Sequence, residues 1–389
     1  MSGPFRIAVV NPVYDPALDT PDALLGRYTT LTGWSRAVAE AGASVEVVQR
    51  FTVDVALARD GVHFRFVRDG HAPFPSASQR LRLVAGAVAE AQPDVVHVNG
   101  LMFPGLLRAL RAALGSATPI VVQDHAGGGV PAGWGRAWWR RRRLRRGLAV
   151  VDACSFTALG QADDLREAGV LGDQRILAIP EASTSMTSPP RHEARRRTSL
   201  LGAPLVLWVG RLNANKDPLT VLAGLDRAFG ALPTARAAMV FAGDESLRPA
   251  VERTIGASPT LRDRIVLVGH VGREEMPYYF AAADLFISGS RREGSGYALI
   301  EAMACGAWPV VTDIPPFQAL TGQVGDRWTP GEAGACAAAV VRAAGRDLAA
   351  GRLRVRAEFD RRLSWRAIAA RTVACYQDLA ASRPPGRGR

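Results

Sequence analysis

Lysine is almost absent from this chain. Lys216 is the only lysine among 48 basic residues, and all the others are arginine. A sequence with so strong a preference for arginine keeps a lysine where a compact, flexible ammonium is needed instead of a planar guanidinium. Chance retention of one lysine would leave the same pattern, so the case for Lys216 depends on its surroundings.

Long apolar runs and paired cysteines are also missing. No run approaches the ~20 residues of a membrane-spanning helix, and the N-terminus leads straight into an expected strand without a signal pattern. We therefore expect a cytoplasmic protein, with peripheral contact at the inner membrane face left open. No C-x-x-C pair offers a zinc site, which favours four buried free thiols. The cysteines are Cys154, Cys305, Cys336 and Cys375.

Expected strands and helices alternate along most of the sequence. The 389 residues exceed the size at which one core keeps growing, and a hydrophobic content of 48% can fill two. The alternation predicts an α/β fold with two doubly wound parallel sheets. The Pro- and Arg-rich residues 187–203 break the pattern, and we interpret them as the linker between domains 1–186 and 204–365. The expected strands are 5–10, 44–49, 94–99, 120–123 and 150–155, then 205–209, 238–242, 264–268, 285–288 and 309–312; helices include 32–41 and 81–91.

Two glutamates flank a run of small residues in the second series. Residues 293–301 read Glu-Gly-Ser-Gly-Tyr-Ala-Leu-Ile-Glu and follow a buried strand pattern. The small residues would open a helix near Gly294, and the free N–H groups at such a helix start favour a diphosphate. Glu293 and Glu301 would repel phosphate, so we expect them to accept hydrogen bonds from sugar and ribose hydroxyls. A solvated glutamate before an ordinary helix would show the same pattern.

A second strand-to-helix loop carries the single lysine. The buried-strand pattern 205–209 ends at Gly210, and Pro218 marks a helix start. Arg211 and Lys216 therefore share one loop, in which both can neutralise a diphosphate.

Together these residues resemble glycosyltransferase family 4, the glycogen-synthase-like retaining GT-B enzymes. Order and spacing match the family over roughly residues 204–315, and 363–376 look like its last helices. The resemblance implies that 366–382 form a helix crossing back to the N-terminal domain, ahead of a disordered tail, 383–389. The matching motifs are Gly210-Arg211-Leu212 with Lys216, Phe241-Ala242-Gly243-Asp244, Val268-Gly269-His270-Val271, residues 293–301, and Glu301-Ala302-Met303-Ala304-Cys305-Gly306 ahead of Pro309-Val310-Val311.

The resemblance implies two Rossmann-like domains facing across a cleft. It implies a retaining glycosyltransferase that moves a sugar from a nucleoside-diphosphate sugar to a hydroxyl acceptor, with no cofactor beyond that co-substrate. A sugar-nucleotide epimerase or a phosphorylase of the same fold is the alternative, although the glutamate pair fits those less well. The implied donor-binding residues are Gly210, Arg211, Lys216, Gly243, His270, Val271, Glu293, Gly294, Ser295, Gly296, Tyr297 and Glu301.

The N-terminal candidates lie at expected strand ends. His125 resembles the family's histidine that donates a hydrogen bond to the donor sugar. No D-x-D motif occurs, so we expect Arg211, Lys216 and the helix start, rather than a metal ion, to stabilise the leaving diphosphate. The expected catalytic residues are Glu293, His125, Lys216 and Arg211, and the acceptor-side candidates are Tyr28, Thr29, Asn99 and Asp124.

The chain departs from the family pattern in three places. Residues 11–15 and 26–30 lack the usual Gly-Gly pair near the donor phosphates. Ser295 stands where relatives commonly have phenylalanine. Glu181 and Ala182 follow a strand where relatives usually place an Asn-Gly turn. The resemblance therefore does not carry over the donor sugar or the acceptor contacts.

A strongly basic run indicates a second class of partner. Residues 134–146 place Trp134, Trp138 and Trp139 among seven arginines, in a chain of net charge +12. An anionic membrane surface or nucleic acid would suit this composition, with nucleic acid the less favoured of the two. A solvated helix that packs its tryptophans on the sheet would show the same pattern.

Overall fold

The computed structural model describes residues 3–68, 77–125 and 136–382, and the chain forms two compact units. Unit 1 comprises Met1–Glu181 with Trp365–Arg389, and unit 2 comprises Ala182–Ser364. The tail 383–389, expected to be disordered, lies outside the described residues.

Unit 1 contains an eight-stranded sheet in the order β3-β4-β2-β1-β5-β6-β7-β8. All neighbouring strands are parallel except β3 and β4, which are antiparallel. The chain builds outward from β1 in one direction and then from β5 in the other, so the sheet has its topological switch point between them. The strands are β1 (Arg6–Asn11), β2 (Ser44–Phe51), β3 (Val55–Arg59), β4 (Val62–Arg68), β5 (Val95–Asn99), β6 (Ile120–Gln123), β7 (Ala153–Phe156) and β8 (Arg175–Ala178).

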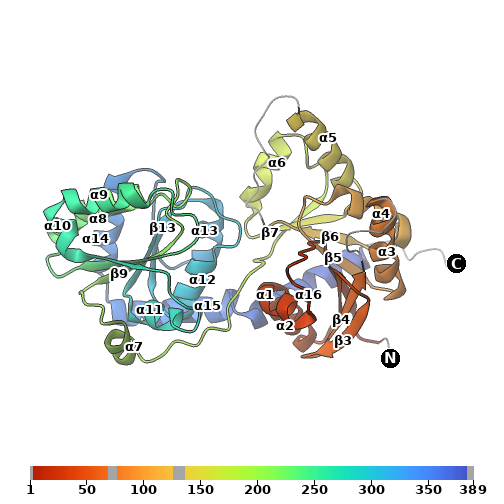
Figure 1. The fold of residues 1–389 in the computed structure, drawn as a ribbon, viewed down its shortest axis with the longest axis horizontal. Coiled ribbons are helices and arrows are strands. Elements are labelled where there is room, and N and C mark those ends of the chain that lie inside the picture. Colours follow the sequence, from red (N-terminus) through yellow and green to blue (C-terminus); the bar gives the residue numbers. More distant parts are fainter. Residues whose placement is uncertain (1–2, 69–76, 126–135, 383–389) are drawn as a thin grey trace. The chain divides into compact units, whose positions relative to one another are not determined.

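Alternating residues of β1 supply the cores on the two faces of this sheet. Ala8 and Val10 belong to one buried cluster, and Ile7 and Val9 belong to the other, as the two-residue period of a strand requires. The first face is covered by α3 (Ala77–Glu90), α4 (Pro104–Leu114) and α5 (Arg136–Leu148), and the second by α1 (Pro21–Arg27), α2 (Thr29–Glu40) and α16 (Trp365–Ala381) (Figure 1). The short helices η1 (Leu159–Ala162) and α6 (Asp163–Glu167) follow β7.

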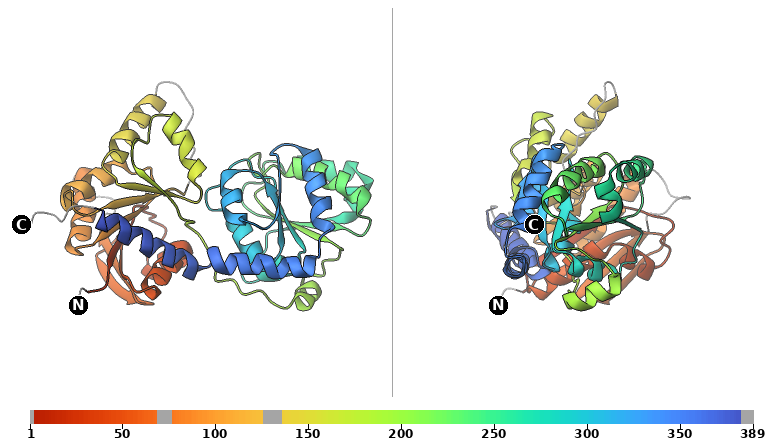
Figure 2. Two further views of the ribbon diagram at one scale, coloured as in Figure 1. Left: turned by 180° about the vertical axis from the view of Figure 1, so that it is seen from behind. Right: turned by 90° about the vertical axis from the view of Figure 1, so that its left-hand side faces the viewer.

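Unit 2 contains a six-stranded, fully parallel sheet in the order β11-β10-β9-β12-β13-β14. Helices cover both faces, as the left view of Figure 2 shows. The strands are β9 (Leu205–Gly210), β10 (Arg236–Phe241), β11 (Ile265–Gly269), β12 (Leu285–Ser288), β13 (Trp308–Thr312) and β14 (Asp326–Trp328). The helices are α7 (Arg191–Thr198), α8 (Pro218–Ala231), α9 (Arg248–Ala257), α10 (Pro259–Arg264), α11 (Met276–Ala282), α12 (Tyr297–Ala304), α13 (Pro315–Thr321), α14 (Ala333–Ala344) and α15 (Leu348–Arg362).

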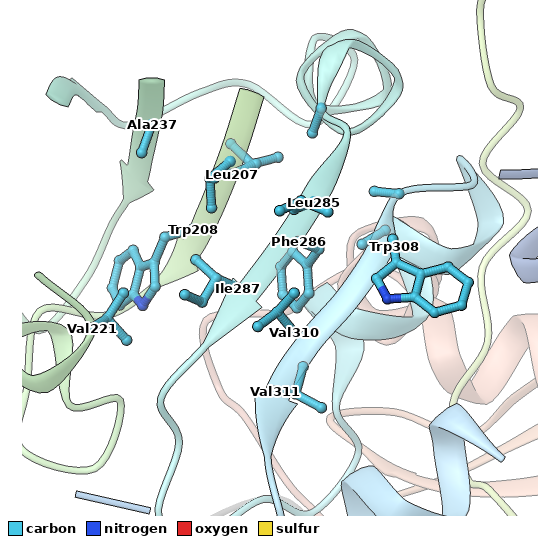
Figure 3. Close-up of a cluster of buried hydrophobic side chains, with 14 of the residues drawn as sticks. Leu207, Trp208, Val221, Ala237, Leu285, Phe286, Ile287, Trp308, Val310 and Val311 are labelled. Carbon is cyan, nitrogen blue, oxygen red and sulfur yellow. The ribbon is translucent and has the colours of Figure 1, made fainter. Parts of the chain in front are cut away.

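The core of unit 2 forms where its central strands pair. Trp208 of β9 lies opposite Ile287 of β12, and Ile287 lies opposite Val310 of β13. All three side chains are at most 1% exposed, and Figure 3 shows them in one cluster with their neighbours. This apolar packing holds the three strands rigidly, so the loops at their carboxyl ends have fixed starting points.

The structure differs from the expected linker over residues 187–203. This segment contains α7, and unit 2 already begins at Ala182. The Arg195 guanidinium donates to the Asp284 carboxylate at 2.8 Å and to the Ala282 carbonyl at 2.6 Å. Arg191 also pairs with Asp284, which is 9% exposed. Arginines that resemble a solvated linker in the sequence therefore fasten α7 to the body of unit 2.

Candidate active site

The carboxyl ends of β9 and β10 bring Gly210, Arg211 and Gly243 together. A Cβ on Gly210 would lie 3.1 Å from the Trp208 ring and 3.5 Å from Lys216 Cγ, so a larger residue here would crowd the Trp208 ring. Gly243 has φ +85°, a left-handed conformation that favours glycine. Arg211 passes about 4.0 Å from where a Cβ on Gly243 would lie, and it is exposed.

Lys216 and Glu293, 77 residues apart, are in contact at the carboxyl ends of the paired strands β9 and β12. The Lys216 ammonium donates to Glu293 Oε1, and the side chains are 25% and 13% exposed, respectively. The Ser290 hydroxyl donates to the same oxygen at 2.7 Å. The ammonium expected to bind a diphosphate is therefore held by the carboxylate expected to bind a sugar.

Further contacts join the two loops that carry this pair. The Arg291 amide donates to the Asn215 carbonyl at 2.8 Å, and Asn215 Nδ2 donates to the Arg292 carbonyl at 3.1 Å. The Arg291 guanidinium pairs with Asp217 at 2.7 Å. A Cβ on Gly289 would lie 3.0 Å from the Asp217 carbonyl oxygen, so this glycine permits the close approach. Sequence reasoning missed Asp217 and Gly289, although the glycine after the strand was a signal.

Helix α12 begins at Tyr297, three residues after the start expected near Gly294. Gly296 forms the N-cap with φ +67°, and a Cβ there would lie 2.5 Å from Leu320 Cδ1. Gly294 and Ser295 therefore belong to the turn that leads from Glu293 into the helix.

Glu301 lies one turn beyond Tyr297 on α12 in a largely buried setting. Burial raises the pKa of Glu301 to about 7, and the positive charge of Arg273 opposes this rise. Burial, then the nearby Glu301, raises the pKa of Tyr297 to about 12. Arg273 follows β11 and had no signal in the sequence analysis. Of the two donor-binding candidates in this loop, His270 is exposed and Val271 packs against the unit 2 core.

In unit 1, Asn99 is held by a buried histidine. His97 Nε2 lies 2.9 Å from Asn99 Oδ1, and His97 Nδ1 lies 2.6 Å from the Tyr376 hydroxyl. Burial lowers the pKa of His97 to about 4, so the imidazole is neutral near pH 7. The Tyr376 hydroxyl then donates to Nδ1, and Nε2–H donates to Asn99, which fixes the orientation of this acceptor-side candidate.

His125 contacts Glu181, the residue that replaces the family's Asn-Gly turn. Glu181 Oε2 lies against His125 Nδ1, and the Glu181 side chain is 2% exposed. Burial lowers the pKa of His125, although Asp124 opposes this shift. The Nδ1 edge of the His125 ring therefore faces the buried Glu181 carboxylate. This contact joins residues 56 positions apart, and no sequence motif predicts it.

The other acceptor-side candidates occupy two different places in unit 1. Asp124 is 5% exposed and follows β6, where its amide donates to the Ser155 carbonyl at 2.9 Å. Tyr28 and Thr29 lie at the junction of α1 and α2. Burial, then Asp15, raises the pKa of Tyr28.

The basic run forms α5, whose arginines include Arg140 to Arg143, Arg145 and Arg146. Trp138 and Trp139 are 53% and 66% exposed, and Trp134 lies outside the described residues. No helix in the described part of the chain combines the length and apolarity needed to cross a membrane. Within the same residues, no group of three or more His, Cys, Asp and Glu side chains could hold a metal ion. Three cysteines are buried, whereas Cys375 is only partly so.

Two family descriptions match the chain, one in each unit. Residues 29–181 match "Glycosyltransferase Family 4", and residues 203–345 match "Glycosyl transferases group 1". A GDP-mannose:cellobiosyl-diphosphopolyprenol alpha-mannosyltransferase of Xanthomonas oryzae is 27% identical over 66% of this chain and 64% of its own length. The enzyme of the same name from Xanthomonas campestris is 30% identical over 62% of this chain and 61% of its own. The matches thus span about three-fifths of these relatives.

Solved structures share the fold at low identity. Sucrose-phosphate synthase from Thermosynechococcus elongatus superposes with a TM-score of 0.68 at 22% identity, covering 97% of this chain and 100% of its own. A glycosyltransferase from Rickettsia africae gives 0.72 at 14% identity over 98% and 100%. These likenesses confirm the expected architecture of two doubly wound parallel-sheet domains, as in GT-B proteins. With a family description matched in each unit, the chain belongs to glycosyltransferase family 4.

Proposed function

We propose that this chain transfers a sugar from a nucleoside-diphosphate sugar to a hydroxyl acceptor, with retention at the anomeric carbon and without a metal ion. The observation that carries the proposal is the contact of Lys216 with Glu293, beside Arg211, at the carboxyl ends of β9 and β12. One small region thus offers cations for a diphosphate and a carboxylate for sugar hydroxyls.

Comparisons support a nucleotide-sugar donor. The two Xanthomonas relatives are named for GDP-mannose, the Anabaena protein HepE was solved with UDP and glucose, and an Escherichia coli protein was solved with UDP-2-fluoro glucose. The last two share the fold with TM-scores of 0.68 and 0.67. For this chain we infer the same class of donor, bound by unit 2.

Each donor group has its own contacts in this proposal. Arg211, Lys216 and the N-terminus of α12 stabilise the diphosphate, as oriented positive charges and N–H dipoles do for a leaving group. Glu293 accepts hydrogen bonds from the sugar, and Glu301 accepts them from the ribose. The remaining donor-binding residues enclose the nucleotide: Gly210, Gly243, His270, Val271, Gly294, Ser295, Gly296 and Tyr297.

The transfer itself takes place on one face of the sugar. The bond from C1 to the phosphate oxygen breaks, and a bond from C1 to the acceptor oxygen forms on the same side. The acceptor proton goes to the departing phosphate oxygen, so no protein general base takes part. The positive charge of Arg211 and Lys216 stabilises the negative charge that develops on that phosphate.

The unit 1 residues bind the sugar and the acceptor in this scheme. Because the Nδ1 edge of His125 faces Glu181, we assign its Nε2 to the hydrogen bond with a sugar hydroxyl. Asn99, Asp124, Tyr28 and Thr29 are assigned to the acceptor side.

Acceptor-dependent release of nucleoside diphosphate tests the function. Thermal stabilisation by UDP, GDP, ADP and TDP sugars without metal identifies the donor first, because a bound ligand raises the midpoint of unfolding. Release of nucleoside diphosphate only when a hydroxyl acceptor is added supports transfer. Interconversion of donor sugars without acceptor would instead indicate an epimerase, and consumption of inorganic phosphate a phosphorylase.

A peripheral membrane contact is the second part of the proposal. Exposed Trp138 and Trp139 on the arginine-rich α5 match an anionic bilayer, in which the indoles enter the interface and guanidiniums bind lipid phosphates. Cosedimentation with vesicles of anionic and of zwitterionic lipid measures this contact. Salt-sensitive binding to the anionic vesicles alone is expected, whereas equal or tighter binding to duplex DNA would favour nucleic acid.

A further inference from the structure

A cavity of about 310 Å³ lies in unit 1 at the carboxyl ends of β1, β2 and β5. Its walls include Pro12 after β1, Arg50 in β2 and the segment 102–106 that leads into α4. Because the switch point of this sheet lies between β1 and β5, the cavity occupies the position where doubly wound folds bind ligands. Its size is in the usual range for small-molecule sites.

Three arginines contribute to the walls of this cavity: Arg50, Arg140 and Arg143. Arg50 Nη1 donates to the Pro12 carbonyl at 2.8 Å, and the guanidinium lies over the Tyr14 ring at 5.8 Å, so this side chain is held in place. No carboxylate belongs to the lining, and within the described residues no ion pair joins Arg140 or Arg143 to one. The site therefore has a concentrated positive charge next to apolar walls.

Helix α5 divides its arginines between two faces. Arg140, Arg143, Leu144 and Gly147 follow the three- and four-residue spacing of one helix face. A Cβ on Gly147 would lie 2.3 Å from Pro104 Cβ, so this face packs directly on the start of α4. Arg140 and Arg143 extend along the same face over the cavity. The opposite face, with Trp138, Arg141, Arg142, Arg145 and Arg146, lines a separate depression of about 550 Å³.

We propose that this cavity binds a phosphate group carried by the acceptor, a specificity site that rests on the glycosyl transfer proposed above. Arg50, Arg140 and Arg143 bind the phosphate through charge-assisted, bidentate hydrogen bonds. The apolar walls, which include Leu81, Phe103 and Leu144, contact the carbon skeleton attached to it. The phosphate serves to position the acceptor and does not react.

Direct binding to the full chain tests this site without depending on turnover. The phosphate probes are geranyl phosphate and glucose 6-phosphate, and geraniol is the uncharged control. The test variant combines Arg140→Gln with Arg143→Gln. Its matched control, Arg142→Gln with Arg145→Gln, removes the same charge at the same spacing from the other face of α5. Calorimetry in vesicle-free buffer measures the affinity of each protein for each probe.

We expect the test variant to bind at least about ten-fold more weakly to the phosphate probe that the wild type binds more tightly, because charged hydrogen bonds are lost. The control should stay within about two-fold of the wild type, because its arginines lie on the other face of α5. On anionic vesicles the order should reverse, with the control variant losing more binding. Preference for geranyl phosphate identifies a lipid phosphate as the acceptor, and preference for glucose 6-phosphate identifies a soluble one.

Equal weakening by both variants would show a nonspecific charge effect and would overturn the site. So would binding of geraniol as tight as that of geranyl phosphate, or no binding of either phosphate probe to the wild type. The proposed function fails separately: a chain that binds a phosphate probe at these arginines but releases no nucleoside diphosphate with any acceptor has the site without the transfer. Nucleoside-diphosphate affinity, assigned to unit 2, should be the same in all three proteins.

Discussion

The Lys216 ammonium and the Glu293 carboxylate lie partly buried against each other, so at the residue scale neither can be altered without affecting its partner. Removing one member of such a pair leaves the other without its countercharge. Arg211 is exposed, so we expect its replacement to affect the stability of the fold less than replacement of Lys216. Variants of these two residues can therefore distinguish an effect on diphosphate binding from an effect on the stability of the fold.

Replacement of Lys216 or Arg211 by alanine should weaken diphosphate binding by about 2 kcal/mol or more each, the usual effect of losing a charged hydrogen-bond partner. Lys216→Ala should also lower the midpoint of unfolding, because Glu293 loses its ammonium, whereas Arg211→Ala should not. Calorimetry with the nucleoside diphosphate and with the bare nucleoside measures the first effect. An equal loss of nucleoside affinity would contradict the assignment.

The two glutamates should respond oppositely to neutralisation. Glu293→Gln should reduce turnover at least ten-fold, about 1.4 kcal/mol of barrier. Its nucleoside-diphosphate affinity should be unchanged or tighter, because Lys216 is released from the carboxylate. Glu301→Gln should weaken the nucleoside part of the donor instead. Turnover and affinity measured together decide the matter, and similar behaviour of both variants would refute the division of roles.

The raised pKa of Glu301 predicts a pH dependence of donor binding. Only the ionised carboxylate accepts hydrogen bonds from both ribose hydroxyls, and burial holds its pKa near 7. Donor affinity should therefore increase about ten-fold between roughly pH 6 and 8. A nucleotide sugar is the suitable ligand, because its diphosphate does not titrate in this range.

The control for this pH dependence is Glu301→Gln, in which the increase should disappear. In the ligand-free protein the sign is opposite. Because the folded pKa is raised, this carboxyl group stabilises unit 2 below its unfolded pKa, and the contribution is lost as the pH rises through about 7. A donor affinity that falls with rising pH would contradict the role of Glu301.

Sequence alone placed some site residues near each other and could not place others. The sequence places Lys216 in the loop after one strand and Glu293 in the loop after another. In a parallel sheet the carboxyl ends of neighbouring strands lie at the same edge, so the fold topology explains why these two side chains are close. The contacts of Glu181 with His125 and of Asp217 with Arg291 join distant segments with no common motif. Arg273 acts through charge on Glu301, and no spacing rule identifies such a residue.

At the scale of elements, the packing of α5 on α4 depends on one glycine. A Cβ on Gly147 would overlap both Pro104 Cα and Cβ, at 2.4 and 2.3 Å. These atoms belong to the backbone and to a rigid ring, so they cannot rotate away as a flexible side chain would. The helix that carries the cavity arginines is therefore positioned by a contact between main chains.

Gly147→Ala should destabilise unit 1 even though alanine is the better helix former. The overlap costs ~1–3 kcal/mol, whereas the gain in helix propensity is at most ~1 kcal/mol. The same change should weaken the phosphate probes, because α5 moves away from the cavity. Gly86→Ala in α3 is the matched control, since a Cβ there meets nothing within 4 Å among the described residues. Urea midpoints compare the two, and equal midpoints would contradict the packing argument.

The element order was largely predictable, although β3, β4, β8 and β14 were not among the expected strands. The central strands β1, β5, β9 and β12 are apolar runs buried on both sides, which composition reveals. The edge strand β3 is largely exposed and β14 has only three residues, so neither gives a strong periodic signal. The sequence of α7 resembles a linker because it is rich in arginine. The contacts with Asp284 that anchor these arginines join segments distant in sequence, so the local pattern does not reveal them.

At the scale of the whole molecule, the metal-independent scheme predicts that EDTA leaves turnover intact. The diphosphate charge is neutralised by side chains and helix N–H groups, so chelation removes nothing that the reaction uses. Initial rates with and without EDTA, each with and without added Mg²⁺ or Mn²⁺, provide the measurement. Activity that disappears on chelation and returns with either metal would reject this account of the leaving group.

Unit 1 is discontinuous in sequence: residues 1–181 form its sheet, and α16 completes it only after all of unit 2. The contacts that join these parts include Tyr376 to His97 at 2.6 Å, the Arg175–Asp378 ion pair at 2.7 Å and the Trp365 ring against Gly33. A ribosome therefore finishes unit 2 while one face of the first sheet still lacks its last helix. We infer that nascent unit 1 exposes this apolar face until α16 is synthesised, so truncation just before α16 would harm the first unit more than the second.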